Sequence, residues 1–119
     1  MLVPLKDHGV PHLLVFWGGT ASGNDSPTEP YQTQPLHQAY DASVARFEKI
    51  VADNPVEGIF GNHPSLDGSA VKLEHLRETP DMPNPYLTGR EPVLRWLRVI
   101  RECNLNNTEV DARKEQMKH

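Results

Sequence analysis

The sequence has almost no cysteine, the residue from which small proteins build disulfides and cysteine zinc clusters. Cys103 is the only cysteine, which excludes an internal disulfide and a zinc cluster made of cysteines. No apolar run approaches the length of a membrane span. Residues 1–6 lack the basic start and long apolar middle of a signal peptide, so a cytoplasmic location is expected. The net charge of −4 disfavours nucleic acid and anionic membrane surfaces as partners.

The length and composition predict one small domain with long irregular segments. The chain has 119 residues, of which 37% are hydrophobic and 24% are charged. Of eleven prolines and eight glycines, seven prolines and four glycines lie in residues 18–35 and 79–92, which predicts two extended loops. The glycines of residues 18–25 suggest a phosphate-binding loop, but their spacing fits neither the Walker pattern nor GxGxxG. A plain loop after a strand is the preferred interpretation.

Short apolar runs predict three β-strands. Residues 2–5 and 13–17 flank a turn in which Asp7 and Gly9 suit a bend, so a β-hairpin is expected. The second run is continuously apolar, which is typical of a strand buried on both faces. Residues 56–60 form a third run soon after a helix, as in an αβ unit.

Apolar residues at helical spacing predict the first of three helices. Tyr40, Val44, Phe47 and Val51 recur on one helical face, and this helix is expected to begin at Tyr40 or Asp41, of which Asp41 is the better cap.

The second helix is expected over residues 68–77, with Asp67 as its N-cap. Its apolar stripe is made of Leu66, Ala70, Leu73 and Leu76, which recur at helical spacing.

The third helix buries one apolar line and is followed by a polar tail. Val93, Trp96, Ile100 and Cys103 form that line, so Cys103 is expected to be a buried small hydrophobe rather than a nucleophile. Residues 104–107 are expected to end the helix, and residues 105–119 are expected to be a frayed or disordered tail. The resulting fold class is α/β, with about three strands and three helices.

Histidines are the main candidates for chemistry, and one of them stands out. None of the six is spaced as HxH, HxxH or HExxH, the patterns with which one element presents two zinc ligands. A solvated surface side chain is the preferred interpretation of His8, His12 and His75. His63 differs because it follows a strand, and ligand sites in α/β proteins lie at the carboxyl ends of strands. A structural role and a ligand role for His63 are evenly weighed on these grounds.

Asp67 has two interpretations. As the N-cap of the following helix it needs no function. As a carboxylate four residues from His63, it would orient the imidazole ring by a hydrogen bond. The cap is the favoured interpretation.

Several segments, taken together in this order and spacing, carry a resemblance to a known family. They are residues 3–9 (VPLKDHG), 17–20 (WGGT), 61–69 (GNHPSLDGS), 83–86 (PNPY), 95–97 (RWL) and 102–103 (EC). The sequence over residues 2–104 resembles the C-terminal half of metallo-β-lactamase-fold hydrolases. The resemblance implies a partial αβ/βα sandwich, and it implies zinc-dependent hydrolysis in which a metal-bound hydroxide attacks an ester, amide or similar bond.

The same resemblance assigns one metal ligand to this chain. In the family, a histidine after a late strand is the last ligand of the second metal, and His63 lies at that place. The family's other ligands come from an HxHxDH motif, a further histidine and often an aspartate, and this sequence has no counterpart of them. A catalytic zinc needs at least three protein ligands. The isolated chain is therefore expected to be inactive and to bind zinc only weakly.

Two hypotheses about function follow. In the first, residues 1–104 are half of a hydrolase domain and supply His63 to a metal site that the missing half completes, in cis or from another chain; self-association through an apolar face is a further expected partner interaction. A half sandwich leaves one sheet face without its partner layer, so an exposed apolar patch is expected. In the second, the chain is a truncated product that is inert or acts as a small interaction module.

Overall fold

The computed structural model describes residues 1–18 and 34–118, and its described part is a mixed α/β structure. Three strands and four helices lie in these residues, which confirms the expected fold class with one short helix more. The chain divides into two compact units. The first comprises Met1–Thr20 and Val51–Leu94, and the second comprises Ala21–Ile50 and Arg95–His119.

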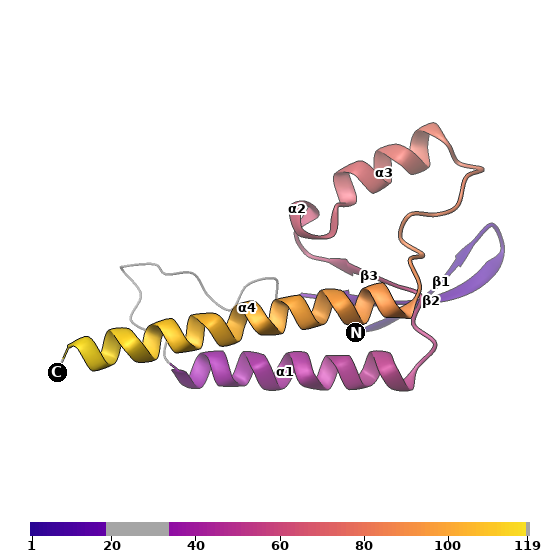
Figure 1. Cartoon of the computed structure of the whole chain (residues 1–119). Helices are drawn as coiled ribbons and strands as arrows, with labels where there is room; N and C mark the ends of the chain where they lie inside the picture. Colours follow the sequence, from indigo (N-terminus) through magenta and orange to yellow (C-terminus); the bar gives the residue numbers. More distant parts are fainter. Residues whose placement is uncertain (19–33, 119) are drawn as a thin grey trace. The chain divides into compact units, whose positions relative to one another are not determined.

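The first unit contains a three-stranded sheet in the order β1-β2-β3 (Figure 1). β1 (Leu2–Asp7) and β2 (Val10–Trp17) pair antiparallel. His8 and Gly9 join them with φ values of 49° and 81°, as a two-residue hairpin turn with two positive φ angles requires. β3 (Gly58–Gly61) pairs with β2 in parallel, with Leu14 opposite Gly58. The predicted hairpin and third strand are therefore confirmed.

Both faces of β2 contribute to the core. Leu14 is 2% exposed, and Val15, on the opposite face because side chains alternate along a strand, is fully buried. Trp17 shares the face of Val15 and is 6% exposed. Phe16 and Phe60 are opposite each other in the register, and their ring centroids are 5.2 Å apart. The predicted burial of this strand on two faces is confirmed.

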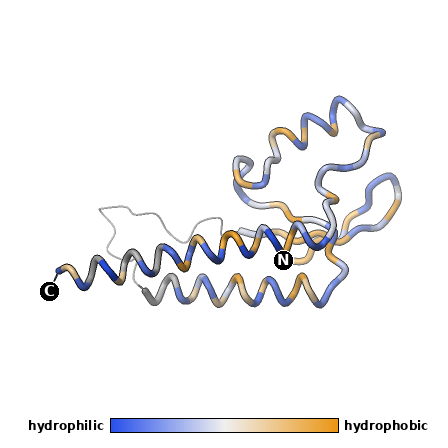
Figure 2. The backbone as a smooth tube through the Cα atoms, viewed as in Figure 1, coloured by the Kyte–Doolittle hydropathy of each residue, from blue (hydrophilic) through white to orange (hydrophobic). Residues whose placement is uncertain are grey.

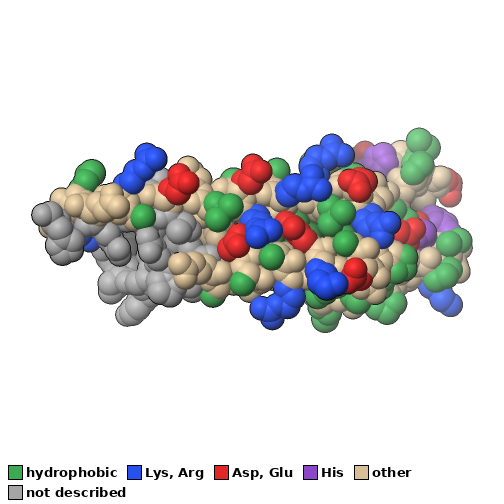
Figure 3. All heavy atoms as spheres, turned by 60° about the horizontal axis from the view of Figure 1, so that its bottom comes forward, with side chains coloured by type: hydrophobic (Ala, Val, Ile, Leu, Met, Phe, Trp, Pro, Cys, Tyr) green, Lys and Arg blue, Asp and Glu red, His purple; other side chains and the backbone are tan. Residues whose placement is uncertain are grey.

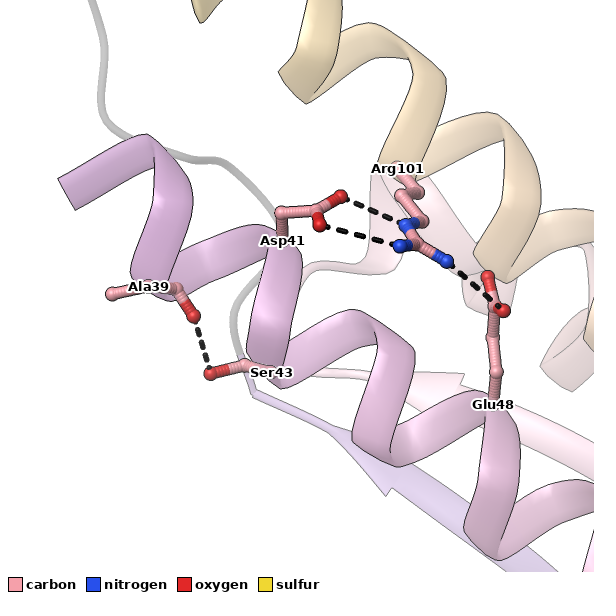
Figure 4. A network of polar contacts seen from close by, with 5 residues as sticks. All are labelled: Ala39, Asp41, Ser43, Glu48 and Arg101. Atoms are coloured by element: carbon pink, nitrogen blue, oxygen red, sulfur yellow. Dashed lines mark hydrogen bonds and ion pairs between the residues drawn. The ribbon is translucent and has the colours of Figure 1, made fainter. Parts of the chain in front are cut away.

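The second unit contains most of α1 (Gln34–Asp53) and of α4 (Arg90–Met117). The two helices run in opposite directions (Figure 1), and hydrophobic and hydrophilic residues alternate along both (Figure 2). Arg101 of α4 donates to both carboxylate oxygens of Asp41 in α1, at 2.8 and 3.3 Å, and lies 3.7 Å from Glu48 (Figure 4). A two-pronged pair of this kind fixes the register of two helices as well as attracting them.

The buried positions of the long helices agree with the sequence pattern in α1 and differ from it in α4. Val44 and Val51 of α1 are fully buried, as predicted. Among the described side chains of α4, Val93, Leu97 and Asn104 are buried, whereas Cys103 is exposed. The prediction that Cys103 is buried is wrong, because the helix turns a different face inward, one residue along from the predicted line.

Two predicted helix ends are also wrong. α1 begins at Gln34, before Tyr40 and Asp41. Pro35 therefore lies in its first turn, where a missing N–H costs nothing because that group has no partner within the helix. α4 continues through residues 104–107 to Met117, because isolated asparagines lower helix propensity only modestly.

Two short helices follow β3. α2 (Pro64–Asp67) is a single turn, and α3 (Ser69–Glu78) matches the predicted second helix closely. No residue of α3 is buried. Leu73 is 57% exposed and Leu66 is 49% exposed, so the predicted apolar stripe is present but does not form core in the described structure.

The predicted loop over residues 18–25, with its phosphate-binding alternative, lies outside the described residues apart from Gly18. In the described part of the chain, no helix is both long enough and apolar enough to cross a membrane.

The close approach of the 79–89 loop to β3 generates a stability prediction. A Cβ added at Gly58 would collide with the backbone carbonyl of Tyr86, whereas one added at Gly18 would meet only the Phe16 ring, at 3.5 Å. We expect Gly58→Ala to lower the free energy of unfolding by about 1–3 kcal/mol, the usual cost of overpacking, measured by urea unfolding. Gly18→Ala is the control. Equal stability of the two variants would show that the loop does not lie against β3.

Candidate functional site

The candidate site is the turn that leaves the carboxyl end of β3. β2 and β3 are parallel, with Trp17 opposite Gly61, so both strands end at the same edge of the sheet. Ligand sites of α/β proteins lie at such an edge. His63 follows β3 directly after Asn62, which is the location that the sequence predicts for it.

The backbone of His63 begins helix α2. His63 is the N-cap, with φ of −122° and ψ of 116°, and Pro64 is the first helical residue. The His63 carbonyl accepts hydrogen bonds from the N–H groups of Leu66, at 3.0 Å, and Asp67, at 3.4 Å. Gly68 ends the turn in the left-handed region, with φ of 70°, and donates its N–H to Pro64. Proline at the start and glycine at the end are the residues that favour such a short helix.

The buried side chain of Asp67 stabilises this turn by hydrogen bonds. The residue has 9% exposure. Oδ2 accepts the N–H of Gly61 at 2.9 Å, and Oδ1 accepts the N–H of Ser69 at 2.8 Å. The prediction that Asp67 is the N-cap of α3 is wrong, because Gly68 occupies that position; Asp67 nevertheless accepts the N–H of Ser69, the first residue of the helix. The described hydrogen bonds of the carboxylate are with Gly61 and Ser69 and not with His63.

The protonation of Asp67 is set by opposing effects. Burial alone raises the pKa of this carboxyl group. Hydrogen bonds from Ser69 and Gly61, with the positive charge of Lys72, outweigh burial and lower the pKa below the ordinary value of 3.8. Ionised carboxylates bind backbone N–H groups more strongly than neutral ones do, so Asp67 holds the turn as a charged group.

The imidazole of His63 takes no part in this bracing. It makes no capping hydrogen bond, and the residue is exposed. An exposed imidazole on a fixed backbone is suited to binding a metal or exchanging a proton. A catalytic zinc requires at least three protein ligands. Among the side chains that the structure describes, no three of His, Cys, Asp or Glu are grouped so that they would hold a metal ion. The described residues therefore do not fit a complete zinc site.

The other described histidines do not gather around His63. His75 on α3 is exposed, as predicted. The Nδ1 atom of His8 lies 3.2 Å from Asp7 at the tip of the hairpin, and its side chain is 64% exposed. A solvated position is confirmed for both.

The prediction that His12 is a solvated surface residue is wrong. Its Nδ1 lies 2.8 Å from Oε2 of Glu57, and its side chain is 16% exposed. The same oxygen of Glu57 accepts the N–H of Leu13 at 3.3 Å, while the backbone of Glu57 donates to the carbonyl of Leu13. The pair joins β2 to the residue before β3, at the end of the sheet opposite His63. The two partners are 45 residues apart, and the sequence has no signal that pairs them.

A groove of about 700 Å³ runs beside this pair, lined by Pro4, Pro11, Pro55, Arg90 and neighbouring residues. Arg90 donates to the carbonyl of Ala52 at 3.1 Å. One of its N–H groups therefore pairs with a carbonyl in the last turn of α1. The groove lies at the amino ends of the strands, where ligand sites are not expected in this class of fold.

Comparison of the chain with protein-family models, curated proteins and solved structures finds no match.

The bracing role of Asp67 predicts a dependence of stability on pH. Asp67→Asn removes the charge, and we expect it to lower the free energy of unfolding at pH 7 by about 1–3 kcal/mol, the cost of weakening buried hydrogen bonds. The pKa is lower in the folded protein than in the unfolded chain. The stability that Asp67 contributes is therefore present above the unfolded pKa and is lost as the pH falls through the folded pKa.

The measurement is urea unfolding of the wild type and Asp67→Asn between pH 7 and pH 3, with the exposed Asp81→Asn as control. The difference between wild type and Asp67→Asn should shrink below about pH 4, near the reference pKa of aspartate. A difference that stayed constant down to pH 3 would contradict a charged brace.

Proposed function

We propose that this chain supplies one metal ligand, His63, to a zinc-dependent hydrolase of the metallo-β-lactamase fold, and that the chain alone is inactive. The observation that carries the proposal is the position of His63. The imidazole is exposed at the carboxyl end of a parallel strand, on a turn whose backbone is fixed by the buried Asp67. Because the backbone of this turn is already ordered, it loses little conformational entropy when the imidazole binds a metal. The segment that carries the resemblance, residues 61–69, is the segment that forms this turn.

The remaining ligands must come from groups other than the described residues of this chain. The partner in this proposal is a missing N-terminal half that carries the HxHxDH ligands, because a second copy of this chain has no such motif. A metal binding only His63 and water would exchange readily, because structural and catalytic zinc sites both use at least three protein ligands.

Charge and location complete the proposal. On the face that Figure 3 displays, acidic and basic side chains are intermingled rather than gathered into a basic patch. This supports a partner other than nucleic acid, and a cytoplasmic location is part of the same proposal.

The alternative is a non-enzymatic product, which is inert or acts as an interaction module. Exposed apolar side chains favour it, since Leu66, Val71, Leu73 and Met82 are each about half exposed or more. The discriminating observation is the coding sequence directly upstream. An in-frame HxHxDH supports the hydrolase, and a stop codon or unrelated sequence supports the alternative.

Metal retention tests the proposal directly. We expect the isolated chain to lose zinc on dialysis and to show no turnover of a generic ester or lactam. Joined to a polypeptide that carries the HxHxDH ligands, the chain should retain zinc, and His63→Ala should reduce the retained zinc measured by atomic absorption. His75→Ala is the matched control, because His75 is an exposed histidine of the same structural unit. Unchanged zinc content in His63→Ala would remove His63 from the ligand set.

A further inference from the structure

A separate feature of the first unit is an apolar cavity of about 240 Å³ that is partly open to solvent. Each strand of the sheet contributes one lining side chain: Leu5 from β1, Leu14 from β2 and Phe60 from β3. The register explains why they meet. Val3 is opposite Leu14 and Leu5 is opposite His12, so Leu5 and Leu14 share one sheet face, and Phe60 shares it because it is opposite Phe16.

The remaining walls of the cavity come from α3 and the 79–89 loop. These residues are Leu73, Asn84, Tyr86 and Leu87. The Tyr86 hydroxyl donates to Oγ of Ser69 at 2.7 Å, and the Tyr86 N–H donates to Oδ1 of Asn84 at 3.0 Å. Nζ of Lys72 lies 4.9 Å from the centre of the Tyr86 ring, within the range of a cation–π contact.

These contacts fix the wall in place before any ligand arrives. Gly58 adds to them, since only a residue without Cβ lets the Tyr86 carbonyl approach β3. A cavity whose walls are already ordered binds without a large ordering cost.

The lining chemistry selects the class of ligand. Five of the seven lining residues are leucine or phenylalanine, and none is charged. A charged group placed inside would lose its hydration without gaining a partner of opposite sign. An apolar cavity of about 150 Å³ takes up benzene, whereas drug-sized ligands occupy about 300–1,000 Å³. The volume here lies between these values.

We propose that this cavity binds a small neutral apolar molecule of one or two rings, about the size of naphthalene. The proposal does not depend on metal binding at His63. A polypeptide segment is a poorer occupant, because its backbone amides would face leucine and phenylalanine side chains without hydrogen-bond partners.

The test uses naphthalene as the probe and the full chain as the protein. Titration followed by ¹H–¹⁵N spectra should shift the amide signals of the lining residues and saturate. Leu73→Trp places a larger side chain at the cavity wall. Because Leu73 is 57% exposed, this variant is expected to fold. We expect it to weaken naphthalene binding by about tenfold or more, which corresponds to about 1.4 kcal/mol.

Leu66→Trp is the matched control, since Leu66 is 49% exposed and does not line the cavity. It should bind naphthalene as the wild type does. Any of three results would overturn the proposal. They are an absence of saturable shifts at the lining residues, equal affinity in Leu73→Trp and wild type, and a wild-type dimer that Leu73→Trp converts to a monomer in sedimentation. The last would show that the cavity is filled by a second copy of the chain.

Discussion

The carboxylate of Asp67 is the interaction on which the candidate site depends. One oxygen holds the last residue of β3, and the other holds the first residue of α3. The two segments would otherwise leave partly buried N–H groups without these partners, at a cost of up to a lost hydrogen bond each. His63 lies between these two anchor points along the chain, so its backbone has little freedom while its ring stays outside. A single buried charge thus determines which way an exposed histidine is presented.

The attachment of α3 also depends on a small number of side-chain contacts. Helices in small domains are usually stabilised by packing an apolar face, yet α3 has no buried residue. It is held instead at its first turns, by the Ser69 hydroxyl on Tyr86 and by Lys72 over the Tyr86 ring. Tyr86 is in turn positioned against β3 by the absence of a side chain at Gly58. One tyrosine therefore links the helix, the proline-rich loop and the sheet.

Much of the fold was predictable because its signals are local. The spacing of Val44 and Val51, the hairpin turn at His8 and Gly9, and the apolar run of β2 are each readable within one segment. The location of His63 after a strand is of the same kind. The spacing of apolar residues did not predict the buried face of α4, where Val93 and Leu97 are buried and Cys103 is not. Several apolar lines on one helix satisfy the same period, and only tertiary packing selects among them.

The contacts that sequence reasoning missed are those between distant segments. Glu57 and His12 meet because β2 and β3 become neighbours, and neither residue lies in a recognisable motif.

The contrast between the two histidines at opposite ends of the sheet bears on function. His12 is largely buried and paired with a carboxylate, so its ring is committed to holding β2 against the start of β3. His63 is exposed, and its ring makes no capping bond. A structural histidine forms its hydrogen bonds within its own fold. A single exposed histidine holds a metal ion stably only when further protein ligands bind the same ion. The turn around His63 is held by the buried, ionised Asp67, and its hydrogen bonds with Gly61 and Ser69 are those that join β3 to the start of α3. Because the turn fixes the backbone and leaves the imidazole exposed, a metal-binding role of His63 would require further ligands from outside the described residues.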